Sequence, residues 1–106
     1  MAFRFAIEDI HFALGEHALD VRSEFPDFAK VIEKTGIDVV HETDFNAIDL
    51  AYLALEKLLI ANPNLKEKVS CLLYVSQSPD RYLPSGACLL QNLCGLPTSI
   101  LAFDIG

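Results

Sequence analysis

The sequence predicts an α/β fold with a mixed sheet, and three stretches near its C-terminal end carry that prediction. Val69–Val75 is a continuous apolar run, which is typical of a parallel strand buried on both faces. Ser85–Gly95 has a helix-capping serine at its start and a glycine at its end, and Ser99–Ile105 is a second apolar strand. Two such strands joined by a helix form a parallel βαβ unit. Ligands of open α/β sheets bind beyond the carboxyl ends of the strands, so we expect the loop Ser76–Pro84 to border a site.

The first third of the chain is expected to form a strand, a loop and a helix. Apolar residues alternate over Phe3–His11, which predicts a strand. Gly15–Arg22 is polar and is expected to be a loop. Apolar residues then recur at helical spacing from Pro26, and Gly36 is a natural end for that helix. Ile37–His41 is expected to be a short extended piece.

A second helix is expected in the middle of the chain. Thr43 or Asp44 would cap it, and it would run to about Ala61, where Asn62–Asn64 surrounds a proline. Its polar residues fall on one narrow stripe, so the helix is expected to be covered on more than one side. Leu65–Lys68 is expected to be a surface link to the βαβ unit.

Charge and composition exclude several classes of partner. Lys plus Arg number 8 and Asp plus Glu number 15, which gives a net charge of −7. A chain this acidic is not attracted to phosphate backbones or anionic lipids, which argues against nucleic-acid and membrane-surface binding. No apolar run approaches the roughly 18 residues of a transmembrane helix. Because signal-peptide features are absent and the three cysteines show no C-x-x-C spacing, we expect a cytoplasmic protein with reduced thiols.

The length allows one domain, and we expect residues 1–106 to form a single, incomplete one. The chain is 52% hydrophobic. Because domains of this size bury only about two-thirds of their potential surface, so apolar a chain would leave an apolar patch in water. We therefore expect it to self-associate or to be part of a larger protein.

Few residues indicate chemistry by themselves. Cys88 lies in the first turn of a predicted helix, which favours a thiolate, but its apolar neighbours favour a buried packing residue. Cys71 and Cys94 are also expected to be structural. The three histidines lack the H-x-x-x-H spacing of a metal site, so no metal is expected. Asp104 lies in an apolar strand, where its carboxylate needs hydrogen-bond partners. Dinucleotide-binding, P-loop and nucleophile-elbow motifs are absent.

The C-terminal third resembles a known family. Residues Ser76–Gly106 have the sequence SQSPDRYLPSGACLLQNLCGLPTSILAFDIG. The spaced set Pro84-Ser85, Ala87-Cys88, Gln91, Leu93, Gly95 and Ala102-Phe103-Asp104 is similar to the beta-ketoacyl-ACP synthase III (3-oxoacyl-ACP synthase III) family of the thiolase-like superfamily. Upstream, Lys34-Thr35-Gly36-Ile37 resembles the family's T-G-I element, and Asp49–Leu59 resembles the helix that follows it.

The resemblance implies a fold and a reaction. The fold would be the N-terminal part of an incomplete thiolase-like αβαβα sandwich. The family transfers an acyl group from coenzyme A to a cysteine and condenses it with malonyl-ACP, with loss of carbon dioxide, as in fatty-acid or polyketide-type biosynthesis. The family's nucleophile follows the A-F-D motif by a few residues, so it is expected just beyond Gly106. No catalytic residue, metal or cofactor is then expected in this chain, which should be inactive alone.

The same resemblance implies binding residues and partners. Leu83, the residue before the loop proline, would form an apolar wall of the partner subunit's acyl pocket. Lys34 stands near the family's coenzyme A contacts, where arginine is more usual, and lysine offers a point charge rather than a fork. Acyl carrier protein is the implied partner, and Ser99–Ile105 is the implied homodimer strand. Two alternatives remain open, namely a non-catalytic or split thiolase-like subunit with a binding or structural role, and an unrelated small α/β domain.

Overall fold

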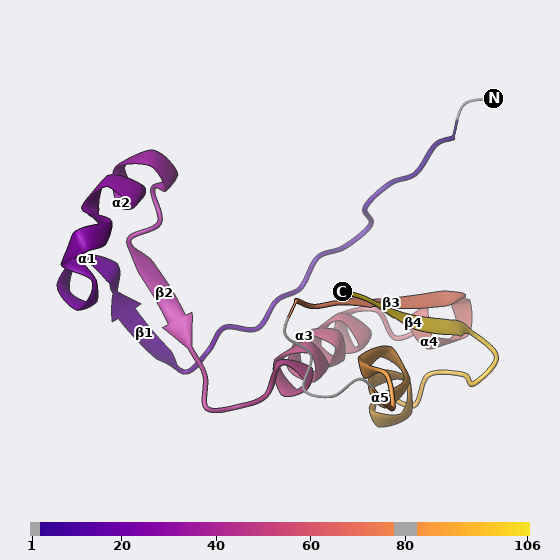
Figure 1. The fold of residues 1–106 in the computed structure, drawn as a ribbon. Helices are drawn as coiled ribbons and strands as arrows, with labels where there is room; N and C mark the ends of the chain where they lie inside the picture. Colours follow the sequence, from indigo (N-terminus) through magenta and orange to yellow (C-terminus); the bar gives the residue numbers. More distant parts are fainter. Residues whose placement is uncertain (1–2, 78–82) are drawn as a thin grey trace. The chain divides into compact units, whose positions relative to one another are not determined.

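Figure 1 shows a computed structural model of the chain, which describes residues 3–77 and 83–106. The chain forms two compact units, each of which is described by itself. Unit 1 comprises Met1–Ala13 and Ala47–Gly106, and unit 2 comprises Leu14–Asn46. Among the described residues, no helix combines the length and the apolar character that crossing a bilayer requires.

Unit 2 is built on an antiparallel pair of short strands. Strand β1 (His17–Asp20) pairs with β2 (Val39–Glu42). Three short helices join the strands in this fully described unit: α1 (Val21–Glu24), η1 (Pro26–Phe28) and α2 (Ala29–Thr35). Asp20 caps α1, since its carboxylate accepts from the Arg22 amide at 3.1 Å and from the Ser23 hydroxyl at 2.7 Å. Gly36 ends α2 with a φ of 73°, a left-handed conformation that favours glycine.

The sequence anticipates unit 2 only in part. The helix expected between Pro26 and Gly36 is present as η1 and α2, and the extended piece at Ile37–His41 overlaps β2. The loop expected over Gly15–Arg22 is wrong, because β1 and the start of α1 lie within it. Strand β1 is exposed except at Leu19, which is half-buried. It therefore lacks the alternation of apolar residues that identifies a strand in sequence.

Unit 1 contains the predicted βαβ unit. Strand β3 (Cys71–Val75) pairs in parallel with β4 (Leu101–Ile105), and α5 (Gly86–Leu93) connects them. Figure 1 shows α5 and α3 (Ala47–Ala61) on the same side of the two strands. The core lies between these helices and the sheet, and its buried side chains are Ile48, Tyr74, Ala87 and Leu90. The fold class expected from the sequence is therefore confirmed for this unit.

The two faces of the β3–β4 sheet differ in exposure. Leu72, Tyr74 and Ala102 point toward the helices and pack in the core. The alternate side chains are exposed although they are large and apolar: Leu73, Val75, Leu101, Phe103 and Ile105. Both faces of the strands are apolar, which is why the sequence shows continuous apolar runs instead of alternation. No helix or strand in the described part of the chain covers the second face.

The expectation of a strand at Phe3–His11 is wrong. These residues form no strand, and Phe5 is 93% exposed. The segment runs beside α3, where the Asn62 side-chain amide donates to Asp9 Oδ2 at 2.7 Å and Lys57 Nζ donates to the Phe12 carbonyl at 3.2 Å. Apolar alternation alone does not make a strand, because a strand also needs a partner backbone.

Two boundaries in the middle of the chain also differ from expectation. Helix α3 begins at Ala47 rather than after Thr43 or Asp44. Thr43 Oγ1 instead accepts a hydrogen bond from the Phe45 amide at 3.0 Å, which closes a local turn. The segment Leu65–Lys68, expected to be a surface link, forms the one-turn helix α4. The end of α3 at Ala61 is as predicted.

Candidate functional site

The carboxyl ends of β3 and β4 form the edge where α/β proteins place their ligands. The strands are parallel and in register, with Val75 opposite Ile105, so both end at this edge. The Ser76 amide donates to the Ile105 carbonyl at 3.1 Å, which extends the pairing past β3. The loop expected to border a site, Ser76–Pro84, follows directly, although its central residues 78–82 lie outside the described residues.

The start of α5 is fixed at this edge by two side chains. Ser85 Oγ accepts from the Cys88 amide at 3.3 Å, the capping bond predicted from the sequence. Asp104 reaches across from β4, where its two carboxylate oxygens accept from the Gly86 amide at 2.8 Å and the Ala87 amide at 2.7 Å. A carboxylate at a helix N-terminus satisfies unpaired amides and complements the helix dipole. The hydrogen-bonding role expected for Asp104 is therefore confirmed.

Close packing beneath this helix start depends on Gly86. A Cβ atom at this position would lie 2.5 Å from Cε1 of the Tyr74 ring and 3.0 Å from Cδ1 of Ile48. Any larger residue would push α5 away from the buried Tyr74 ring. The glycine thus lets Asp104 reach the helix amides while the helix rests on the core.

The cysteines are placed differently from one another. Cys88, expected to be a buried packing residue, is exposed, with its Sγ 4.0 Å from the Ala102 carbonyl. Cys71, expected to be structural, is also exposed because it lies on the uncovered sheet face. Cys94, expected to be structural, is buried, and burial raises the pKa of its thiol, while the smaller influences of Lys66 and Glu56 oppose each other. None of the three thiols has a histidine partner among the described hydrogen bonds.

Unit 2 contains a polar cluster that the sequence did not reveal. His17 Nε2 lies 3.0 Å from Asp44 Oδ2 and 3.9 Å from Glu16 Oε2. Glu16 also accepts from the Thr43 hydroxyl at 2.6 Å and from the Asp44 amide at 3.0 Å. Hydrogen bonding to Asp44 raises the pKa of His17, and the Thr43 hydroxyl lowers the pKa of Glu16. Sequence reasoning missed this group because residues 16 and 17 are far from 43 and 44 in the chain.

Glu16, His17 and Asp44 could also be considered as cation ligands. Their potential ligand atoms lie within 4.8 Å of one another. All three are exposed, and each is already accounted for by hydrogen bonds to its neighbours. The cluster therefore acts as a link between the two ends of unit 2, and it gives no independent reason to assign a metal.

The two binding residues implied by the family resemblance lie in different units. Lys34 is in the last turn of α2 in unit 2. Leu83 is 87% exposed in unit 1, immediately before Pro84 and the start of α5. Each is therefore accessible to a ligand or a partner chain.

Comparison with known proteins identifies the fold. No protein-family model matches the chain. A 2.1 Å crystal structure of 3-oxoacyl-(acyl-carrier-protein) synthase III matches with 34% identity and a TM-score of 0.78, over 94% of this chain and 32% of that one. The chain is structurally similar to 3-oxoacyl-ACP synthase III, and its fold is thiolase-like. The resemblance predicted from residues 76–106 is confirmed.

Further solved structures agree. A 3-oxoacyl-(acyl-carrier-protein) synthase from Burkholderia xenovorans LB400 is 28% identical, with a TM-score of 0.72, over 91% of this chain and 30% of that one. A complex of MvaS with 3-hydroxy-3-methylglutaryl coenzyme A has a TM-score of 0.84 at 20% identity, over 100% of this chain and 27% of that one. At 20% identity, the likeness to MvaS concerns the fold alone. The chain spans about a third of the length of these structures.

Proposed function

We propose that the chain is the N-terminal part of a 3-oxoacyl-ACP synthase III-like condensing enzyme. The observation that supports this most is the 34% identity to a 3-oxoacyl-ACP synthase III over 94% of the chain. The parallel β3–β4 pair, with α5 held by Asp104, adds a rigid support at the edge where ligands of α/β sheets bind.

The proposed reaction has two steps. A cysteine thiolate first attacks an acyl thioester, so that an acyl-cysteine forms and the thiol of the carrier leaves. Malonyl-ACP then loses carbon dioxide, and the resulting carbanion attacks the acyl-cysteine to give 3-oxoacyl-ACP and the free thiolate. In the family this cysteine follows the A-F-D motif by a few residues, so we expect it after Ala102-Phe103-Asp104 and beyond Gly106. The exposed Cys88 precedes the motif and is not the proposed nucleophile.

Within this proposal the chain contributes binding surfaces rather than catalytic groups. Leu83, exposed beside the start of α5, would line the acyl pocket of a partner subunit in a homodimer. Lys34, in the last turn of α2, would hold an anionic group of the acyl donor, either coenzyme A or acyl carrier protein. The homodimer would form through Ser99–Ile105, and the enzyme would work in the cytoplasm with acyl carrier protein and without a metal or cofactor.

An acyl-transfer assay tests the proposal. The full coding sequence that contains this chain is expressed, and the 106-residue chain serves as the matched control. Labelled acyl-CoA followed by malonyl-ACP should give an acyl-cysteine and then 3-oxoacyl-ACP only with the protein expressed from the full coding sequence. Turnover by the 106-residue chain alone would contradict the prediction that this chain is inactive by itself. If the protein expressed from the full coding sequence forms no acyl-cysteine, the enzyme proposal is contradicted.

A second candidate is a thiolase-like subunit that binds a partner and performs no chemistry. The uncovered apolar face of the β3–β4 sheet is the observation that favours it, because such a face normally packs against protein. A coding sequence that ends at Gly106, together with a second chain that co-purifies and covers this face, would support this candidate over the first.

A further inference from the structure

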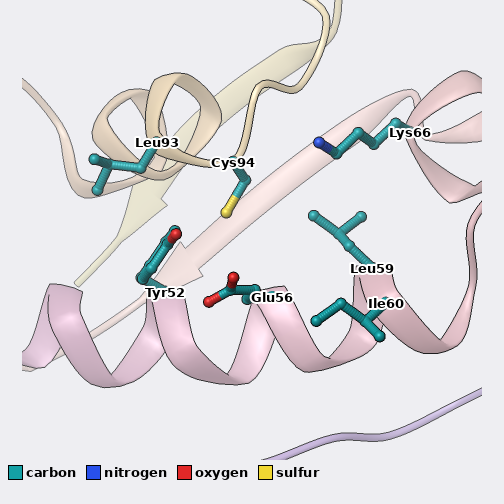
Figure 2. Close-up of a pocket in the computed structure, with 7 residues that line it drawn as sticks. All are labelled: Tyr52, Glu56, Leu59, Ile60, Lys66, Leu93 and Cys94. Carbon is teal, nitrogen blue, oxygen red and sulfur yellow. The ribbon is translucent and has the colours of Figure 1, made fainter.

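A cavity of about 270 Å³ lies in unit 1 between α3, α4 and the end of α5 (Figure 2). Seven residues line it: Tyr52, Glu56, Leu59, Ile60, Lys66, Leu93 and Cys94. The four from α3 are spaced by four, three and one residues, so they share one helix face. Because α4 precedes β3 and Cys94 precedes β4, the cavity lies toward the amino ends of the two strands.

The cavity carries one acidic and one basic group. Glu56 is half-buried on α3, and Lys66 projects from α4 toward the end of α5 (Figure 2). Within the described ranges 3–77 and 83–106, neither side chain makes a hydrogen bond or an ion pair. Partial removal of a carboxylate from water without a partner is unfavourable. Lys66 is exposed to water, so a ligand that carries both charges would relieve this cost at Glu56 and would place its anionic group beside Lys66.

The rest of the lining is apolar. Leu59 and Ile60 on α3 and Leu93 on α5 supply aliphatic surface, and Tyr52 adds an aromatic ring. Ile60 and Leu93 are among the large hydrophobic side chains that remain exposed. The volume is slightly below the range of about 300–1,000 Å³ found for drug-sized ligands, which indicates a smaller molecule.

We propose that this cavity binds a small zwitterion with an apolar body, of the size and charge of a free aliphatic α-amino acid. The ammonium group of the ligand pairs with Glu56, and its carboxylate pairs with Lys66. Its aliphatic side chain contacts Leu59 on α3. This site is independent of the proposed condensing activity, since none of the residues named there lines the cavity.

Cys94 provides a reporter within the site. It is 7% exposed, and Figure 2 shows its sulfur directed toward α3, where Glu56 lies. Cys71 and Cys88 are exposed and would react first with alkylating reagents. A Cys71→Ser/Cys88→Ser protein therefore carries a single thiol in the cavity. A bound ligand should slow its alkylation.

The test titrates L-leucine into the purified chain and follows backbone amide signals by NMR. Saturable shifts should be centred on α4 and the ends of α3 and α5. Two analogues isolate the charges: 4-methylpentanoate lacks the ammonium group, and 3-methylbutylamine lacks the carboxylate. Each should bind at least about tenfold more weakly than leucine, as expected for the loss of one charge-assisted contact. Because the analogues use the unmodified protein, this comparison does not depend on the folding of a variant.

Variants locate the site. Glu56→Gln and Lys66→Met should each weaken leucine binding about tenfold. Lys68→Met is the matched control, since Lys68 lies on the same short helix outside the cavity and should leave binding unchanged. The proposal is overturned if leucine gives no saturable shifts, if both analogues bind as tightly as leucine, or if Lys68→Met weakens binding as much as Lys66→Met.

Discussion

Unit 1 buries Tyr74, Ala87 and Leu90 between its sheet and its helices, whereas Ile32 is the one hydrophobic side chain buried in unit 2 among the described residues. Unit 2 relies instead on the β1–β2 ladder and on hydrogen bonds between exposed side chains. Apolar burial contributes roughly 1.5–3 kcal/mol for each large side chain, while exposed polar pairs contribute about 1 kcal/mol or less. Unit 1 should therefore be the more stable of the two, and the two should respond to different perturbations.

The largest expected effect is the loss of a core side chain in unit 1. Leu90 is 3% exposed, so Leu90→Ala should destabilise unit 1 by about 2–5 kcal/mol through lost burial and a cavity. Leu93→Ala on the same helix is the control, because Leu93 is 54% exposed and should cost no more than about 1 kcal/mol. All three tyrosines lie in unit 1 and the chain has no tryptophan, so tyrosine fluorescence in a urea titration reports on this unit alone. Equal costs for the two variants would contradict the proposed core.

A smaller effect is expected where α5 approaches the Tyr74 ring. Gly86→Ala places a Cβ against that ring, and overpacking of this kind costs about 1–3 kcal/mol. The same urea titration measures it. In a Tyr74→Ala background the ring is gone, so the added cost of Gly86→Ala should fall. If the cost is the same in both backgrounds, the close approach of helix and ring is not its cause.

The same contrast explains which parts of the fold the sequence predicted. In unit 1, the apolar runs at 69–75 and 99–105 and the capping Ser85 each have a local signature, and the βαβ unit follows from them. In unit 2, β1 is held by backbone pairing with a strand about 20 residues away, and its exposed side chains carry no periodic signal. The alternation at Phe3–His11 was misleading because no described backbone pairs with it.

The features of the candidate site were also predictable from the sequence only in part. The role of Asp104 was predictable, since a carboxylate in an apolar strand must find hydrogen-bond donors, and the amides of α5 are the nearest. The exposure of Cys88 was not predictable, because it depends on which side of the helix the sheet covers. The Glu56–Lys66 cavity was also missed, since the pattern of α3 shows a polar stripe but not what faces it.

Two residues cap the start of α5: Ser85, which is adjacent in sequence, and Asp104, which reaches across from β4. Their contributions to the stability of unit 1 can be measured separately. Asp104→Asn keeps one acceptor oxygen but turns an amide group toward a helix N–H, so a charge-assisted bond is lost. We expect a cost of about 1.5–3 kcal/mol by urea titration. Ser85→Ala removes one capping bond and should cost about 1 kcal/mol. The order of the two costs is the diagnostic result, and a larger cost for Ser85→Ala would mean that the serine, not the aspartate, fixes the helix start.

The smallest expected effect is the pH dependence of unit 2. The hydrogen bond to Asp44 raises the pKa of His17 above its ordinary value of 6.5. The contact therefore stabilises unit 2 fully below about pH 6.5, and this contribution is lost as the pH rises through the raised folded-state pKa. Glu16 behaves oppositely, since its lowered pKa means that its contribution is lost only as the pH falls below its ordinary value of 4.5. All these groups are exposed, so the effect should be small and should weaken with salt.

An NMR titration of the His17 ring measures this directly. The pKa should fall toward 6.5 in Asp44→Asn, whereas Asp38→Asn serves as a control that removes an acidic charge outside the cluster. Amide protection at Val39–Glu42, measured relative to the intrinsic exchange rate at the same pH, should fall above the His17 pKa in the unchanged protein, because the link between the two ends of unit 2 is then weaker. If amide protection in unit 1 falls over the same pH range, or if Asp44→Asn leaves the His17 pKa unchanged, the polar cluster does not hold unit 2 in the way that its geometry indicates.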